Sequence, residues 1–172
     1  MQFPELVETR RSVRAYAKRA IEPAKLEAIL TAIRLAPSAG NLQAYQVLMI
    51  EKEATKAALA SAAFSQSFVA EAPVVLVFCA NSERSAGKYG RRGADLYCIQ
   101  DTTIAASYAQ LAVTASGLAS CWVGAFDEGR AAELLGLPAR LRPIVILPIG
   151  YAAESPGRSP RRSLQELVHR DT

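Results

Sequence analysis

The sequence predicts a single α+β domain in which helices pack against a sheet of four or five strands. Two features support this class: one long apolar helix is expected at residues 95–117, and apolar β-rich stretches alternate with helices without a regular strand–helix–strand rhythm. A chain of 172 residues is long enough for one domain with a substantial core and short for two. We therefore treat residues 1–172 as one domain.

The central helix is the most distinctive element of the sequence. Between residues 96 and 119 the chain carries a single charge, Asp101, and alanines or larger apolar side chains fall on every side. A helix of this kind is normally buried on all sides. Gly117 suits the left-handed residue that ends a helix, and residues 121–123 then predict a short buried strand.

The same stretch does not predict a membrane span. Too many polar side chains interrupt it for a segment in lipid. They are Gln100, Asp101, Thr102, Thr103, Ser107, Gln110, Thr114 and Ser116.

The other elements follow from apolar periodicity and from turn residues. Further helices are expected at residues 3–9, 22–36, 55–70 (as one or two helices), 128–135 and 163–169. Further strands are expected at residues 45–50, 74–80 and 142–150. Residues 37–41 read PSAGN, a loop whose Gly40 and Asn41 tolerate positive φ. Residues 81–93 are polar, basic and rich in glycine, which predicts a loop over a site.

Composition excludes several classes of function. The only histidine, His169, lies in a polar run near the C-terminus, which argues against Ser-His or Cys-His catalysis and against a histidine-rich metal site. No GxxxxGK[ST] loop and no strand–GxGxxG–helix unit occurs. The three cysteines form no CxxC pair and lie in apolar surroundings, and residues 1–14 lack the apolar run of a signal peptide. We expect buried free thiols, a cytoplasmic location and no metal.

The net charge of +4 raises the question of nucleic acid. Basic residues concentrate at 10–19, 84–92 and 158–170, without interleaved aromatic residues or a recognisable reading helix. Contacts to one small phosphate explain these clusters at least as well. We expect no nucleic acid, and a small basic nucleic-acid-binding protein remains the alternative from another class.

Four motifs in register carry a family resemblance. They are RRSVRAY at residues 10–16, PSAGNLQ at 37–43, CWVGAF at 121–126 and SPRRSL at 159–164. Each alone has a simpler explanation as a basic run, a turn, a core tryptophan or surface charge. Together, around an alanine-rich helix, they resemble the FMN-dependent nitroreductase family, in its compact branch, over essentially the whole chain. The resemblance implies a central mixed or antiparallel sheet flanked by helices.

The resemblance also implies a set of cofactor-binding residues. They are Arg10, Arg11, Ser12, Arg14, Pro37, Ser38, Asn41, Gln43, Val123, Gly124, Ala125, Arg161 and Arg162. Arg10, Ser12 and Arg161 would hold the FMN phosphate, because guanidinium forks and a hydroxyl suit a phosphate dianion. Arg162 is the alternative to Arg161.

Two of these positions would act in catalysis. Arg14 would lie near flavin N1 and the C2 carbonyl, where a cation stabilises the reduced ring. The backbone near Gly124 would direct an N–H at flavin N5, where glycine allows a close approach. The implied reaction is a ping-pong shuttle, in which NADH or NADPH gives a hydride to N5 and a nitroaromatic, quinone or related acceptor then takes the electrons.

The resemblance finally implies a homodimer whose FMN sites lie at the subunit interface, with the loop of residues 37–43 supplied by the partner. The apolar central helix also indicates a dimer, because a second copy would shield part of it from water. An alternative with the same fold is a specialised flavin enzyme, dehalogenase-like or flavin-degrading, that does not use NAD(P)H directly.

Overall fold

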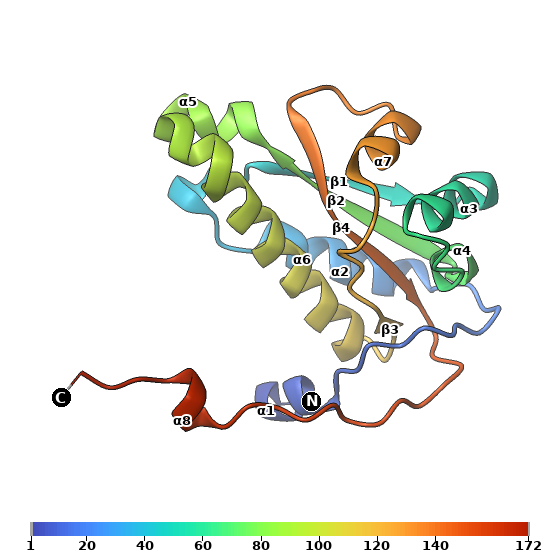
Figure 1. Ribbon diagram of the computed structural model, residues 1–172. Coiled ribbons are helices and arrows are strands. Elements are labelled where there is room, and N and C mark those ends of the chain that lie inside the picture. The colour runs from blue at the N-terminus through green and yellow to red at the C-terminus, as the bar shows by residue number, and fades with distance from the viewer. Residues whose placement is uncertain (1, 172) are drawn as a thin grey trace.

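The computed structural model describes residues 2–171 and places one antiparallel sheet between two layers of helices (Figure 1). The strands are β1 (Tyr45–Ile50), β2 (Val74–Asn81), β3 (Ala119–Ser120) and β4 (Leu141–Gly150), in the spatial order β1-β2-β4-β3. Every pair of neighbouring strands is antiparallel. The α+β class and the four-stranded sheet expected from the sequence are confirmed.

Both faces of the sheet are covered by helices. On one face Val75 and Val77 of β2 join the core formed with α3 (Glu53–Ala62), α4 (Phe68–Glu71) and α7 (Glu128–Leu134). On the other face Leu76 and Phe78 join the core formed with α2 (Pro23–Arg34) and α6 (Cys98–Ala115). Because successive side chains of a strand point to opposite faces, β2 is apolar and buried at every position.

The central helix α6 follows one turn of π-helix at Gly93–Tyr97. Its sheet-facing side is buried, but Ser107 and Tyr108 are exposed in the single chain, so burial on all sides is not observed. The sequence did not reveal this partly polar face, because small hydroxyl residues barely interrupt the apolar pattern of the helix. The hydroxyls of Thr103 and Ser107 donate to the carbonyl oxygens of Gln100 (2.9 Å) and Thr103 (2.8 Å), which satisfies them within the helix.

The predicted loop at residues 81–93 is wrong, because these residues form the helix α5 (Ser82–Arg92). The side chain of Asn81 accepts a hydrogen bond from the Arg84 amide (3.0 Å) and caps the first turn. Charged residues occupy the outer face of α5, and Ser85 on its inner face is buried. Charge and glycine content were therefore misleading indicators of loop structure here.

The strand expected at residues 121–123 begins two residues earlier, as β3. Ser120 pairs with Ile149, and Val123 pairs with Ile146 in the same register, as an isolated bridge. In this register Cys121 lies opposite Pro148, which has no N–H to donate. The proline interrupts the ladder and splits the expected strand.

The terminal segments frame one end of the molecule (Figure 1). The remaining helical segments are α1 (Phe3–Thr9), a 3₁₀ turn at Ala39–Asn41 and α8 (Leu164–Leu167). Cys79, Cys98 and Cys121 are buried free thiols, as expected. Among the described residues, no helix is long and apolar enough to cross a membrane.

Candidate functional site

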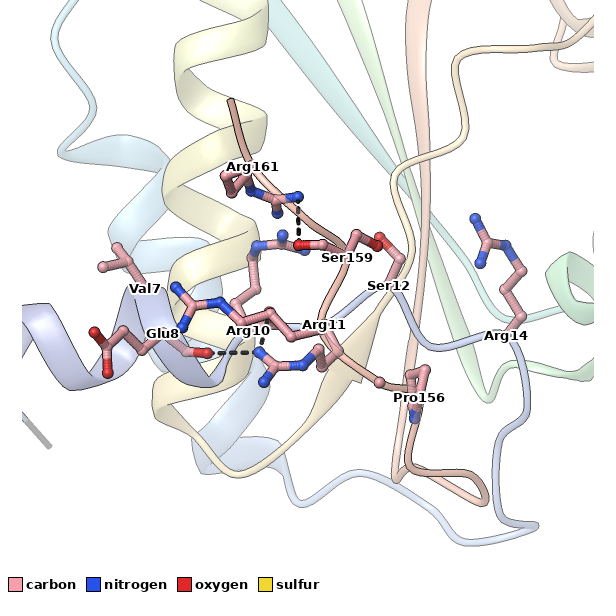
Figure 2. A pocket seen from close by; sticks show the side chains of 11 residues that line it. Val7, Glu8, Arg10, Arg11, Ser12, Arg14, Pro156, Ser159 and Arg161 are labelled. Carbon is pink, nitrogen blue, oxygen red and sulfur yellow. Dashed lines mark hydrogen bonds between the residues drawn. The ribbon is translucent and has the colours of Figure 1, made fainter. Parts of the chain in front are cut away.

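Arginines from both ends of the chain line one cavity of about 270 Å³ (Figure 2). The residues that line it are Val7, Glu8, Arg10, Arg11, Ser12, Arg14, Pro156, Gly157, Arg158, Ser159 and Arg161. The N-terminal motif and the C-terminal motif, far apart in the sequence, thus form one surface. This surface is where the sequence predicted a phosphate site.

The cavity exists because residues 12–17 are fixed between two other segments. On one side the Val13 amide donates to the carbonyl oxygen of Ser120 at 3.1 Å. On the other side the Ala17 amide donates to Tyr151 O at 2.8 Å, and the Ala153 amide donates to Ala15 O at 2.9 Å. These bonds lead the chain after β4 back along the N-terminal segment, so that residues 156–161 arrive beside Arg10.

The arginines differ in how far the protein itself uses them. Nη1 of Arg11 donates to the carbonyl oxygens of Glu8 (2.5 Å), Arg10 (3.0 Å) and Thr9 (3.1 Å), and so closes the C-terminal end of α1. Arg161 makes only long contacts, of 3.3 and 3.4 Å, to neighbouring carbonyl oxygens. Arg161 is therefore freer than Arg11 to bind an anion.

Arg161 and Arg162 also differ in their position relative to the cavity. Arg161 lines it, whereas Nη2 of Arg162 donates to the Glu166 carbonyl oxygen of α8 at 2.8 Å. The geometry favours Arg161 as the phosphate ligand. Arg158, which lines the cavity too, was missed as an individual residue, although it belongs to the basic cluster seen in the sequence.

Arg14 lies apart from the other arginines (Figure 2). Its guanidinium carbon is 6.0 Å from the centroid of the Phe68 ring, and its backbone amide donates to Oε1 of Glu154 at 2.5 Å. Burial raises the pKa of the nearby Cys121 thiol, although the positive charges of Arg14 and Arg10 act in the opposite direction. A cation in this position suits a role different from phosphate binding.

The segment of residues 123–125 presents backbone groups to its surroundings. Val123 is fixed by two hydrogen bonds of 3.0 Å with Ile146, and Gly124 and Ala125 are exposed. Within residues 2–171, neither the Gly124 amide nor the Ala125 amide donates a hydrogen bond. Both amides are available to a ligand.

Gln66 connects this segment to the surroundings of Arg14. Its Nε2 donates to the Ala125 carbonyl oxygen at 3.0 Å, and two residues later Phe68 lies beside Arg14. Arg14 and residues 124–125 are thus joined through residues 66–68. Nothing in the sequence pattern singled out these residues, because they resemble any alanine-rich helix connection.

The loop of residues 37–43 lies at the other end of α6. Its Ala39 amide donates to Oδ1 of Asp101 at 2.8 Å, while the Thr114 end of α6 lies near Arg11 and Thr9. At about 1.5 Å per residue, the thirteen helical steps from Asp101 to Thr114 span roughly 20 Å. The chain therefore does not bring Pro37, Ser38, Asn41 and Gln43 to the arginine-lined cavity.

This loop has a strained and well-defined shape. Gly40, Asn41 and Gln43 have φ values of 56°, 56° and 49°. Ser38 Oγ accepts a hydrogen bond from the Gln43 amide at 2.9 Å. Non-glycine residues with positive φ often mark functional positions. The positive φ of Gly40 and Asn41 was anticipated, and that of Gln43 was not.

The donors of the arginine-lined cavity fit the phosphate end of a flavin nucleotide. Guanidinium groups and the Ser12 hydroxyl are the donors that bind phosphate dianions in proteins. Residues 7–67 and 60–151 match the family described as nitroreductase. The chain belongs to the nitroreductase family.

Relatives of this nitroreductase-family chain cover most of its length. A protein of Thermus thermophilus named NADH dehydrogenase is 32% identical over 92% of this chain and 91% of its own. The oxygen-insensitive NADPH nitroreductase of Salmonella typhimurium is 29% identical over 96% of this chain and 72% of its own. The FMN reductase [NAD(P)H] of Bacillus subtilis is 27% identical over 94% of this chain and 70% of its own.

Solved structures confirm the nitroreductase fold. The NfrA1 nitroreductase of B. subtilis superposes with a TM-score of 0.92, at 22% identity, over 99% of this chain and 74% of its own. A nitroreductase family protein of Streptococcus pneumoniae superposes with a TM-score of 0.88, at 21% identity, over 99% of this chain and 100% of its own. The second match shows that a compact chain of this kind can form the whole fold.

Proposed function

We propose that this chain is an FMN-dependent oxidoreductase that uses NADH or NADPH to reduce small acceptors such as nitroaromatics and quinones. The observation that carries the proposal is the arginine-lined cavity, with Arg14 and the unpaired amides of residues 124–125 on the same chain. Relatives named NAD(P)H nitroreductase and FMN reductase support the same activity.

The residues of the cavity would hold the phosphate. Arg10, Ser12 and Arg161 are the principal ligands in this proposal, and Arg158 adds positive charge. Arg11 is committed largely to the carbonyl oxygens at the end of α1, so its main task is to shape the segment.

Bound FMN supplies two-electron chemistry, with hydride transfer from NAD(P)H and delivery to the acceptor as separate steps at one face of the ring. Arg14 would offset the negative charge that builds up on the ring when it is reduced. The Gly124 amide would donate a hydrogen bond to flavin N5. The fold holds both segments in place: the backbone N–H of Arg14 donates a hydrogen bond to the Glu154 carboxylate, and Gly124 follows Val123, which pairs with Ile146.

The separation of the loop of residues 37–43 from the cavity supports a site shared by two subunits. Within one chain the two groups lie at opposite ends of α6. A homodimer in which Ser38, Asn41 and Gln43 of one copy reach the cofactor held by the other would bring them together. The partly exposed outer face of α6 is available for that interface.

The test starts with the colour of the purified protein. We expect a yellow protein that releases FMN on denaturation and that NADH or NADPH bleaches under argon. Initial rates with a nitroaromatic or quinone should then give parallel double-reciprocal lines, as ping-pong kinetics require. A protein that cannot be reconstituted with FMN would contradict the proposal. A yellow protein that neither NADH nor NADPH bleaches would favour the specialised flavin enzyme instead.

A further inference from the structure

We propose that Lys88 and Tyr89 on α5 select acceptors that carry a carboxylate. The inference rests on the proposed function, in which the loop of residues 37–43 contacts the cofactor. It extends that function by naming a substrate class and the residues that recognise it.

The two side chains converge on Gly40 at the tip of that loop. A Cβ built on Gly40 would lie 2.6 Å from Nζ of Lys88 and would also clash with the Tyr89 hydroxyl. In the observed arrangement both groups occupy the space that a side chain of residue 40 would take. An ammonium and a phenol therefore lie directly against a loop that we assign to the active site.

The Lys88 ammonium lies 5.4 Å from the centroid of the Tyr89 ring, and neither polar group has a hydrogen-bond partner among the described residues. Within residues 2–171, Lys88 Nζ forms no ion pair and no hydrogen bond, and the Tyr89 hydroxyl forms no hydrogen bond. Two acidic groups near this end of α6 have other partners, although the buried Oδ2 oxygen of Asp101 accepts no hydrogen bond. Asp95 pairs with Arg91 at 3.1 Å, and Asp101 accepts from the Ala39 amide.

The arrangement is held in place by contacts between α5 and its neighbours. Nε of Arg84 donates to the Leu42 carbonyl oxygen, and the Asn81 amide donates to Ala44 O at 2.9 Å. The Tyr89 ring packs edge-to-face on Tyr97, with centroids 5.1 Å apart. The donors are thus presented by a supported surface, whereas a free lysine on a mobile loop would have no fixed position.

The chemistry of the pair favours a carboxylate. A carboxylate has two oxygens that accept hydrogen bonds, one from an ammonium and one from a phenol, and the ammonium adds charge assistance. A neutral carboxamide of the same shape can accept the phenol hydrogen bond but lacks the charge. Lys88 should therefore favour binding of the carboxylate over the carboxamide, and Tyr89 should contribute to the binding of both ligands.

Binding of benzoate and benzamide to the oxidised holoenzyme tests this directly, with the flavin absorbance as the signal. We expect benzoate to bind more tightly than benzamide. Lys88→Gln should weaken benzoate by about 3- to 10-fold, the range of a partly exposed charge-assisted contact, and should change benzamide far less. Tyr89→Phe should weaken both ligands. The matched control is Lys52→Gln, an exposed lysine that precedes α3, and it should change neither.

Turnover provides the second measurement, with 4-nitrobenzoate and 4-nitrobenzamide as acceptors. The ratio of their kcat/KM values should fall by about 3- to 10-fold in Lys88→Gln and stay constant in Lys52→Gln. Benzoate binding no tighter than benzamide, or ratios equal in wild type and Lys88→Gln, would overturn the inference. Either result leaves the proposed function standing as long as the protein holds FMN and NAD(P)H bleaches it.

Discussion

Arg10 and Arg14 lie four residues apart on one extended segment, and their side chains have different surroundings. Both arginines line the cavity, but Arg14 also lies beside Phe68, and its backbone N–H donates a hydrogen bond to Glu154. The sequence motif predicted that both bind the cofactor. Their different positions come from how residues 12–17 are held between β3 and the chain after β4.

For Arg14 we predict an effect on redox chemistry. Arg14→Ala should lower the reduction potential of the flavin while much of the FMN stays bound, because a cation near the reduced ring is lost. A loss of about 2 kcal/mol corresponds to roughly 40 mV for a two-electron couple. Spectroelectrochemical titration of the holoenzyme measures the shift. A normal FMN content together with an unchanged reduction potential would show that Arg14 is only a surface charge.

For the cavity we predict selective loss of phosphate recognition. Arg10→Ala and Arg161→Ala should weaken FMN much more than riboflavin, which lacks the phosphate, by about 10-fold or more per charge-assisted contact. Arg162→Ala is the matched control, because its guanidinium bonds to Glu166 of α8 outside the cavity. Titration of the apoprotein with both flavins gives the two affinities. Equal losses for FMN and riboflavin would indicate an effect on folding or on the ring.

At the scale of elements, the sequence predicted the helices and strands that have a strong pattern of buried apolar residues. It missed the features that depend on a single contact. The strand β1 has the predicted bounds, and β2 and β4 differ from theirs by one residue, because continuous apolar runs leave little choice. The helix α5 was missed because its stability comes from the Asn81 cap and from packing against the π-helical turn. The interruption after Ser120 depends on Pro148, a partner that only the sheet register reveals.

Two glycines of α5 test how this helix is built. Gly90 has φ 57° and ψ −145°, a conformation that essentially only glycine adopts, and a Cβ there would meet no other atom within 4 Å. Gly90→Ala should therefore destabilise the protein by about 1–3 kcal/mol through backbone strain alone. Gly87→Ala is the control: it has helical geometry and open space, and it should be neutral or stabilising by up to about 1 kcal/mol. Urea unfolding followed by circular dichroism gives the free energy of unfolding of both variants. Equal changes in the two variants would contradict a kink at Gly90.

The core strand β2 gives a prediction about alkaline stability. Burial raises the pKa of the Cys79 thiol from about 9 to about 12. Because the folded pKa is raised, the unfolded chain loses this proton first, and stability falls as the pH rises from 9 towards 12. One such group costs at most about 1.4 kcal/mol per pH unit. Cys79→Ala should therefore lose less stability than wild type between pH 8 and 10 in urea titrations, whatever its absolute stability. Parallel losses would mean that other groups control alkaline unfolding.

For the whole molecule, one chain carries two candidate site regions that do not meet. The arginine-lined cavity lies near the Thr114 end of α6, and the loop of residues 37–43 is bound to Asp101 at the other end. The sequence resemblance and the apolar central helix implied a partner, and the separation of the two regions within one chain supports that proposal. Exposed apolar side chains at Leu164 and Leu167 of the C-terminal segment add surface that a second copy would cover.

Complementation tests the shared site without relying on the size of the protein in solution. Arg14→Ala and Asn41→Ala each damage one half of the proposed site, and each variant should be nearly inactive alone. When the two are unfolded together in equal amounts and refolded, half of the dimers are mixed. In a mixed two-fold dimer, one site collects both substitutions and the other collects neither.

Random assembly should therefore restore about one quarter of wild-type sites, because half of the dimers each regain one site of two. The measurement is the rate of FMN-dependent NAD(P)H oxidation per mole of chain, compared with each variant refolded alone. Co-refolding Arg14→Ala with Arg10→Ala is the matched control: both changes lie on the same half of the site, so mixing restores nothing. Activity at the mean of the two separate variants in the first experiment would show that each site is built within one chain, even if the protein is dimeric.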